Sequence, residues 1–371
     1  MKYRQLLIVI IGVYVLLPCC SDVHNGGSIE SLFSNHEGGL VSIMDSIELE
    51  AYGILRPEGL AIWKECFIIQ KGDGNEFIAL IRPSSDECVF YVKKGRGPKE
   101  IWMSPSMMKV TDNQLQLYDI SRQRLITISL EQKPDSDDNI SITPFPVHME
   151  QKGEDILPYR LFALATGGNK YYASGFISGM WYSALDIDGF PQSGIEYVNH
   201  PSLDNLSPEE KAILHISSQI VVHPNGKQVA SALVHGAALS FSLMEKGQLK
   251  EVARHVFYPP LIESSHERGM STLAYKPESR RSCCALKCDD KYIYYLYSGR
   301  DFNSQNPWYQ GCDLYVFDWS GKPIRHYILQ QDAIDFEIQG QLLFTISSHP
   351  KSIIYVHKIE DLGASTEENN H

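Results

Sequence analysis

Short runs of alternating apolar and polar residues, each closed by a turn signal, fill the chain from about residue 40 onward. Such runs are typical of half-buried β-strands, and clusters of Gly, Asn, Asp and Pro between them are typical of tight turns. Long amphipathic helical runs are nearly absent. One short helix is predicted at Ser207–Ile216, where a Ser cap, a Pro and an acid follow one another. The pattern therefore predicts an all-β fold.

The predicted strands group into units that recur about every 50 to 65 residues, slightly longer than the blade repeat of common β-propellers. Each unit holds three or four strands. The innermost strands are predicted to begin near Leu60, Met107, Leu161, Gln219, Ser282 and Asp332. These six units predict a six-bladed β-propeller. Two stacked β-sandwiches are the alternative.

The last unit, from residue 332 to 358, supplies only three strands, while Leu40–Glu50 is a strand without a unit. A propeller removes its open edges when a strand from one end of the chain completes a blade at the other. We therefore expect Leu40–Glu50 to complete the last blade by pairing with Ile353–Lys358 or with the outer edge of that blade.

The first residues form an export signal. Lys2 and Arg4 precede the apolar run Leu6–Leu17, which is too short to span a bilayer comfortably. The following residues resemble a bacterial lipobox, with Leu17 three residues before Cys20. Cys19 fits less well, because Pro18 would then directly precede the cut. An uncleaved anchor and a plain secretory signal are the alternatives to lipidation at Cys20.

Four segments follow from these patterns. Residues 1–19 are predicted to be the signal peptide, 20–39 a polar and Gly-rich flexible tether, 40–360 the propeller and 361–371 a disordered tail. The formal net charge of −12 argues against nucleic acid as a partner, since phosphate binding needs a dense basic face.

Two stretches carry a resemblance to a known family. Lys94–Glu100 (KGRGPKE) and Cys312–Ile324 (CDLYVFDWSGKPI), together with the lipobox, resemble the TolB-like six-bladed β-propeller lipoproteins of Gram-negative gut anaerobes. Lys99 stands where these proteins usually have Gly. The resemblance implies a propeller held in the cell envelope, lipid-anchored to the outer membrane on its periplasmic side or at the cell surface. It implies almost no chemistry.

The basic loop Lys93–Glu100 admits two interpretations. It is either a tight connection between blades, in which Gly95 and Gly97 take positive φ, or an anion site. In the second case, successive backbone N–H groups would hold a carboxylate or phosphate together with Lys93, Lys94 and Arg96. The loop lacks the strand and helix context of a nucleotide-binding cradle.

The sequence shows no metal or cofactor signature, so no cofactor is expected. The 13 histidines lack ligand spacing, and no CxxC pair exists. Disulfides remain possible, for instance between Cys66 and Cys88 or between Cys288 and Cys312, although buried free thiols are the leading expectation. Hydrolase signatures such as G-x-S-x-G are missing.

Blade topology selects the candidate binding residues. In a propeller, the loop between the second and third strands and the loop to the next blade open on the same face. Three long loops are predicted there: Lys93–Ser106 with Arg96 and Trp102, Tyr258–Arg281, and Arg300–Gly311. Arg with exposed Trp and Tyr is the composition of binding hot spots and sugar platforms. The predicted ligand-binding residues are Arg96, Arg268, Arg300, Trp308 and Tyr309.

The function predicted from these observations is a membrane-tethered, non-catalytic module that binds a protein or a ligand, such as a glycan or an anionic ligand. An enzyme, a glycoside hydrolase or lyase with acids converging at the ring centre, is the alternative. Carboxylates converging in the central funnel would favour the enzyme, and a Trp- and Tyr-lined face would favour the binding module.

Overall fold

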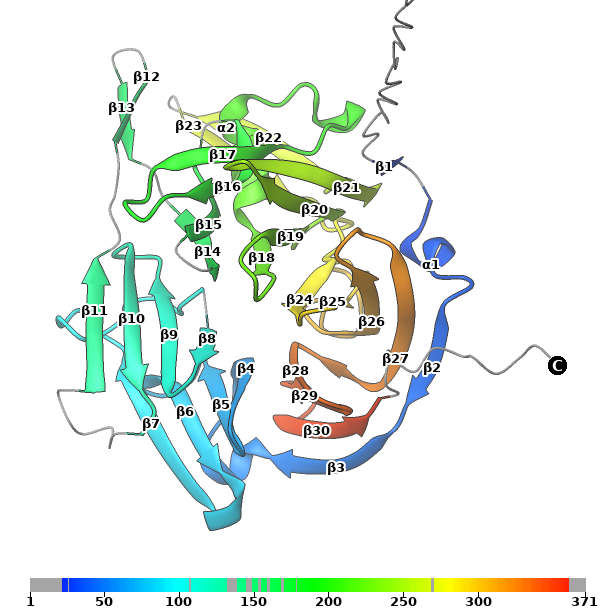
Figure 1. The fold of residues 1–371 in the computed structure, drawn as a ribbon. Coiled ribbons are helices and arrows are strands. Elements are labelled where there is room, and N and C mark those ends of the chain that lie inside the picture. The colour runs from blue at the N-terminus through cyan, green and yellow to red at the C-terminus, as the bar shows by residue number, and fades with distance from the viewer. Residues whose placement is uncertain are drawn as a thin grey trace, which may run out of the picture.

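The computed structural model describes residues 22–25, 27–106, 108–131, 139–144, 149–152, 155–158, 161–167, 170–177, 179–267 and 270–359. Six sheets surround a common centre, as Figure 1 shows. The all-β six-bladed propeller predicted from the repeat is therefore confirmed. Each inner strand begins within about three residues of its predicted position, because period-two alternation between turns marks a strand locally.

The first three blades are formed by consecutive strands. Blade 1 consists of β4 (Pro57–Trp63), β5 (Cys66–Lys71), β6 (Glu76–Arg82) and β7 (Glu87–Lys93). Blade 2 consists of β8 (Met108–Thr111), β9 (Gln114–Asp119), β10 (Arg124–Ser129) and β11 (Ile140–Pro144). Blade 3 consists of β14 (Leu161–Gly167), β15 (Lys170–Gly175), β16 (Met180–Leu185) and β17 (Pro191–Glu196).

The other three blades each take an outer strand from the N-terminal part of the chain. Blade 4 consists of β18 (Ser218–Val222), β19 (Gln228–Leu233), β20 (Ala237–Glu245), β21 (Gln248–Tyr258) and β1 (Asp22–Asn25). Blade 5 consists of β24 (Cys283–Cys288), β25 (Tyr292–Tyr297), β26 (Gly311–Asp318), β27 (Pro323–Ala333) and β2 (Glu37–Val41). Blade 6 consists of β28 (Asp335–Gln339), β29 (Leu342–Ser347), β30 (Ile353–Lys358) and β3 (Ile43–Glu48).

The ring closes through an N-terminal strand, as the count of strands per blade predicts. Strand β3 pairs antiparallel with β30, with Ile47 opposite Ile354 and Glu48 opposite Ile353. The chain then passes through a short 3-10 turn, Leu49–Tyr52, into the inner strand β4. The N-terminal strand therefore completes the last blade, and the expected pairing with Ile353–Lys358 is confirmed for Ile43–Glu48. Leu40 and Val41 instead end β2 and pair with β27 of blade 5.

The predicted flexible tether, residues 20–39, is not free of the ring: β1 pairs with β21, and the residues from Ile29 onward also pack on it. Helix α1 (Ile29–Leu32) and the following Phe33 bury the Ile29 and Phe33 side chains, each 1% exposed, against blades 4 and 5. Strand β2 then runs parallel to β27. Figure 1 shows this N-terminal segment, in blue, wrapping around the outside of the ring. The buried Ile29 and Phe33 hold this segment because the neighbouring blades supply the surface that they cover.

The core lies between blades. Each of the six buried clusters in the described part of the chain joins two consecutive blades, and the cluster containing Leu49, Ile81 and Ile354 joins blade 6 to blade 1. Within the described residues, no helix is long and apolar enough to cross a membrane.

One face of the ring carries the long connections. Because the strands of a blade alternate in direction, the loops between second and third strands and the connections to the next inner strand emerge together. We call this side the loop face. It bears the hairpins β12 (Met149–Lys152)–β13 (Asp155–Pro158) and β22 (Ile262–Glu267)–β23 (Met270–Tyr275), and helix α2 (Pro208–Ile216). Helix α2 has the predicted capping box of Ser207 and Glu210.

Candidate functional site

Two tryptophans on the loop face are each covered by an arginine. The guanidinium carbon of Arg96 lies 3.8 Å from the ring centre of Trp102, and that of Arg281 lies 5.2 Å from the ring centre of Trp308. Among the described residues, neither arginine has a carboxylate within ion-pair distance. We call these the first and second Arg–Trp pairs. Each stacks a guanidinium on an indole ring, and cations and aromatic rings are the groups that suit anionic and sugar ligands.

The first pair is open to solvent. Arg96 is exposed and Trp102 is 52% exposed. Both belong to the connection from blade 1 to blade 2, which the sequence analysis placed on this face. A large aromatic ring that remains half uncovered on a folded domain is available for contact with a ligand.

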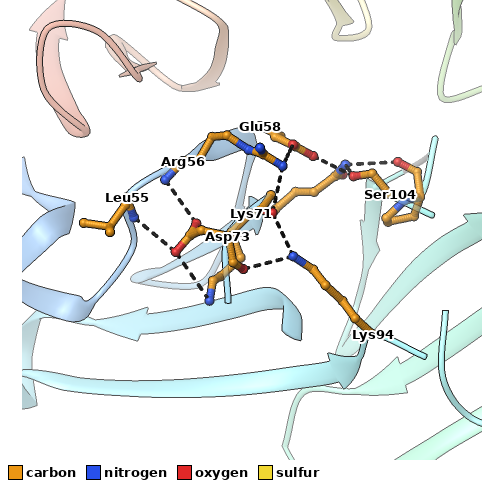
Figure 2. Close-up of polar contacts among 10 residues, drawn as sticks. Leu55, Arg56, Glu58, Lys71, Asp73, Lys94 and Ser104 are labelled. Carbon is orange, nitrogen blue, oxygen red and sulfur yellow. Dashed lines mark hydrogen bonds and ion pairs between the residues drawn. The ribbon is translucent and has the colours of Figure 1, made fainter. Parts of the chain in front are cut away.

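Blade 1 fixes both ends of the loop that carries the first pair, as Figure 2 shows. At the start of the loop, Lys94 Nζ donates to the carbonyl oxygens of Gly72 and Asp73 at 2.8 and 3.0 Å. Near its end, Ser104 Oγ donates to Glu58 Oε2 at 2.6 Å. These hydrogen bonds anchor the loop that carries the first pair. Burial lowers the pKa of the Lys94 ammonium group that makes two of them.

The same network ties the ring closure to blade 1. The Asp73 carboxylate accepts from the backbone N–H groups of Leu55 and Arg56, at 3.3 and 3.0 Å. The Arg56 guanidinium lies 3.4 Å from Glu58 Oε1 and donates to the Gly72 carbonyl. Figure 2 shows these contacts converging on Asp73 and Glu58.

The backbone cradle predicted as an anion site is filled by the chain itself. Glu100 Oε2 accepts from the Gly97 N–H at 2.6 Å. A β-carbon at position 95 would overlap the same carboxylate. Neither Gly95 nor Gly97 has positive φ, contrary to the expectation. The loop is a tight connection, as in the first interpretation, but its glycines do not adopt the left-handed conformation that this interpretation assigned to them.

The second pair stands on a group of stacked rings. His235 stacks on Tyr275 with 4.1 Å between ring centres, and lies 5.8 Å from Trp308. Phe302, 37% exposed, packs against Trp308 at 4.7 Å. Burial lowers the pKa of His235 to about 4, so the ring is neutral and acts as an apolar support. Trp308 itself is half-buried, with its neighbour Tyr309 38% exposed.

A central cavity of about 530 Å³ opens between the inner strands. Three carboxylates line it: Glu58, Asp335 and Glu337. Lys287 Nζ lies 2.8 Å from Glu337 Oε1 and 3.5 Å from Asp335 Oδ1, and also donates to the Leu60 carbonyl. Asp335 in turn accepts from the Leu60 N–H at 2.8 Å. These contacts link blades 5, 6 and 1, and the positive charge of Lys287 neutralises part of the negative charge of Asp335 and Glu337.

A family model decides the classification. The model described as "TolB-like 6-blade propeller-like" matches residues 84–341, more than half of the 371-residue chain. The chain belongs to this family.

Solved structures with similar folds share little sequence with this TolB-like propeller. A candidate exported protein from Bacteroides fragilis is 11% identical over 92% of this chain and 99% of its own, with a TM-score of 0.48. A DUF4221 family member from Bacteroides vulgatus is 8% identical over 86% of this chain and 98% of its own, with a TM-score of 0.45. No curated protein matches the sequence.

In this TolB-like propeller the predicted binding residues separate into two groups. Arg96 lies beside blade 1, whereas Arg300, Trp308 and Tyr309 lie in the loop of blade 5, and Arg268 and Cys20 fall outside the described residues. Arg300 does not serve as a free donor, because it forms a two-point ion pair with Asp332. Arg281, which the sequence analysis only counted within a loop, occupies the position beside Trp308.

All six cysteines after the lipobox are free thiols in the structure, so neither disulfide that the spacing allowed is formed. Within the described part of the chain, no three His, Cys, Asp or Glu side chains gather in a way that could hold a metal ion.

Proposed function

We propose that this TolB-like propeller is an exported, lipid-anchored binding module that recognises acidic glycans through the two Arg–Trp pairs of its loop face. The observation that carries the proposal is the pairing of Arg96 with Trp102 and of Arg281 with Trp308, with no competing carboxylate in the described residues. Arginine offers a planar fork of donors for a carboxylate, and the indole ring offers a flat surface for a sugar ring.

The charge of the protein favours a localised site. On a chain of net charge −12, an arginine without an acid partner stands out as a local positive spot. An acidic polymer would contact the module at these spots and be repelled elsewhere. Two separate pairs also favour an extended ligand, because linked contacts raise the overall affinity beyond that of either pair.

Lipid anchoring at Cys20 is part of the proposal and rests on the signal sequence. The apolar run Leu6–Leu17 and the spacing from Leu17 to Cys20 support it. Cys20→Ala should release the protein from membranes or leave an unprocessed precursor. Membrane association with an unchanged mature mass in this variant would contradict the anchor.

The glycan test uses oligogalacturonides as acidic probes and cello-oligosaccharides of equal length as neutral ones. Acidic probes should bind the full-length protein, and Trp102→Ala, Arg96→Gln or Trp308→Ala should each weaken binding about tenfold, since stacking on one ring contributes about 1–3 kcal/mol. Arg82→Gln is the matched control, because Arg82 pairs with Glu87 on the opposite face.

Two outcomes would contradict this assignment. One is equal binding of neutral and acidic probes, and the other is unchanged affinity in all three variants. Capture of an envelope protein that is lost in the same variants would replace the glycan by a protein partner.

A second candidate function, a hydrolase or lyase, has one observation in its favour. Asp335 and Glu337 stand two residues apart on β28 and both line the central cavity, and burial raises the pKa of Glu337. Both carboxylates also contact Lys287, and this contact gives them a structural role that needs no catalysis. Turnover of a glycan that is abolished by Glu337→Gln would support the enzyme, and absence of turnover would leave the binding module.

A further inference from the structure

The central cavity contains a lysine that no acid in the described part of the chain neutralises. Lys109, on β8 of blade 2, donates through Nζ to the carbonyl oxygen and to Oγ1 of Thr166, at 2.9 and 2.8 Å. Both residues line the cavity. Within the described residues, no carboxylate pairs with Lys109. Since an ammonium group has three N–H donors, one is left for a ligand.

The other lysine of the cavity shows the contrast. Lys287 contacts two carboxylates and a carbonyl oxygen, so its charge and its donors are used within the protein. Burial acts to lower the pKa of Lys287, but Asp335 and Glu337 outweigh it and raise the pKa above its usual value. Two lysines in one cavity therefore have different roles: Lys287 joins blades, and Lys109 keeps an unbalanced charge.

Burial of an unbalanced ammonium is unfavourable without a counter-charge. It lowers the pKa of Lys109. The nearby thiol of Cys288 does not supply the charge, because burial raises its pKa to about 12 and keeps it protonated at neutral pH. A bound anion would supply it and would stabilise the charged form of Lys109.

We propose that Lys109 and Thr166 form a binding site for the carboxylate of a small organic monoanion that enters the central cavity. A volume of about 530 Å³ lies within the range of small-molecule sites. The site shares no residue with either Arg–Trp pair, so it is independent of glycan binding on the loop face.

The walls indicate what the rest of the ligand is like. The walls combine apolar side chains, such as Ile62, with uncharged polar ones, such as Gln219. The group of Lys287, Asp335 and Glu337 carries one more negative than positive charge when ionised, and would oppose a second anionic group. A ligand with one carboxylate and an uncharged body fits both features.

The test uses benzoate and hexanoate as probes, with benzamide and hexanamide as uncharged counterparts. Saturation-transfer NMR on the full-length protein in detergent should show saturable binding of the carboxylates and not of the amides. Lys109→Met should weaken binding at least tenfold. The control Lys64→Met, at a surface lysine that is 58% exposed, should not, and neither should Trp102→Ala or Trp308→Ala on the loop face.

Absence of saturable binding, equal binding of the amides, or unchanged binding in Lys109→Met would overturn the proposal. Where Lys109→Met fails to fold, the wild-type protein provides the answer. Saturating benzoate should slow the acetylation of Lys109 by acetic anhydride, measured by mass spectrometry, and leave that of Lys64 unchanged. Equal acetylation rates of Lys109 with and without benzoate would equally overturn it.

Discussion

The guanidinium of Arg300 donates to both carboxylate oxygens of Asp332, at 2.7 and 2.8 Å. The same group donates to the carbonyl oxygens of Pro307 and Gln310. Arg300 therefore connects the two ends of the loop that presents Trp308 and Tyr309 to strand β27 of blade 5. Its pKa is raised by the hydrogen bonds to Asp332, so it is charged at every accessible pH.

Loss of this ion pair should destabilise the domain. Arg300→Met and Asp332→Asn should each lower the free energy of unfolding by about 1–3 kcal/mol, because each leaves a partly buried charged group short of a partner. Denaturant unfolding of both single variants and the double variant measures the coupling. A coupling energy near zero would show that the pair does not hold the loop.

The contact between Gly95 and the Glu100 carboxylate leads to a second prediction. Gly95→Ala should displace the carboxylate and break its hydrogen bond from the Gly97 N–H, at a cost of about 1–2 kcal/mol in unfolding free energy. In a Glu100→Ala background the same substitution should cost less, because the obstructing group is gone. Equal costs in both backgrounds would mean that the carboxylate does not set the requirement for glycine.

The inner strands and the ring closure were predictable because their signals are local. Alternation and turn residues mark each strand, and the count of strands required Leu40–Glu50 to complete blade 6. The hydrogen bond from the Gly97 N–H to Glu100 could also have been predicted, since Glu100 lies three residues from Gly97 and is the nearest carboxylate in the sequence. The sequence could not show that Arg281, and not Arg300, lies over Trp308. Arg300 is held by Asp332, which is 32 residues away along the chain.

The segment containing Phe33 was misjudged for a related reason. Its neighbours are polar and Gly-rich, which by themselves predict a flexible chain. The surface that orders it belongs to blade 5, almost 300 residues away in the sequence, where Phe33 lies 4.8 Å from Tyr315 and 5.0 Å from Phe317 between ring centres. Local composition contains no information about such a partner.

The packing of Phe33 gives the third prediction. Phe33→Ala should lower the free energy of unfolding by about 3–5 kcal/mol, as expected for removal of a fully buried aromatic ring. The control Met44→Ala, at a side chain that is 62% exposed on β3, should change it by less than about 0.5 kcal/mol. An unchanged unfolding midpoint in Phe33→Ala would instead support the prediction that this segment is a flexible tether.

The fourth prediction concerns acid stability and rests on His215 of helix α2. Its Nε2 accepts from the Val198 N–H at 3.0 Å, so its Nδ1 carries the proton and donates to the Lys211 carbonyl. Burial lowers the pKa of His215 to about 4, below the value of about 6.5 in an unfolded chain. Between these values the unfolded state binds a proton that the folded state does not.

Stability should therefore be complete above about pH 6.5 and fall as the pH is lowered towards 4, by at most about 3 kcal/mol from this residue. His215→Gln should reduce stability at pH 7 but flatten its decline with acid, measured by denaturant unfolding between pH 7 and 4. Ser218→Ala is the matched control: it removes the hydroxyl that donates to the His215 carbonyl, so it should lower stability without changing the slope. A slope that is the same in His215→Gln and in the wild-type protein would rule out His215 as a source of acid sensitivity.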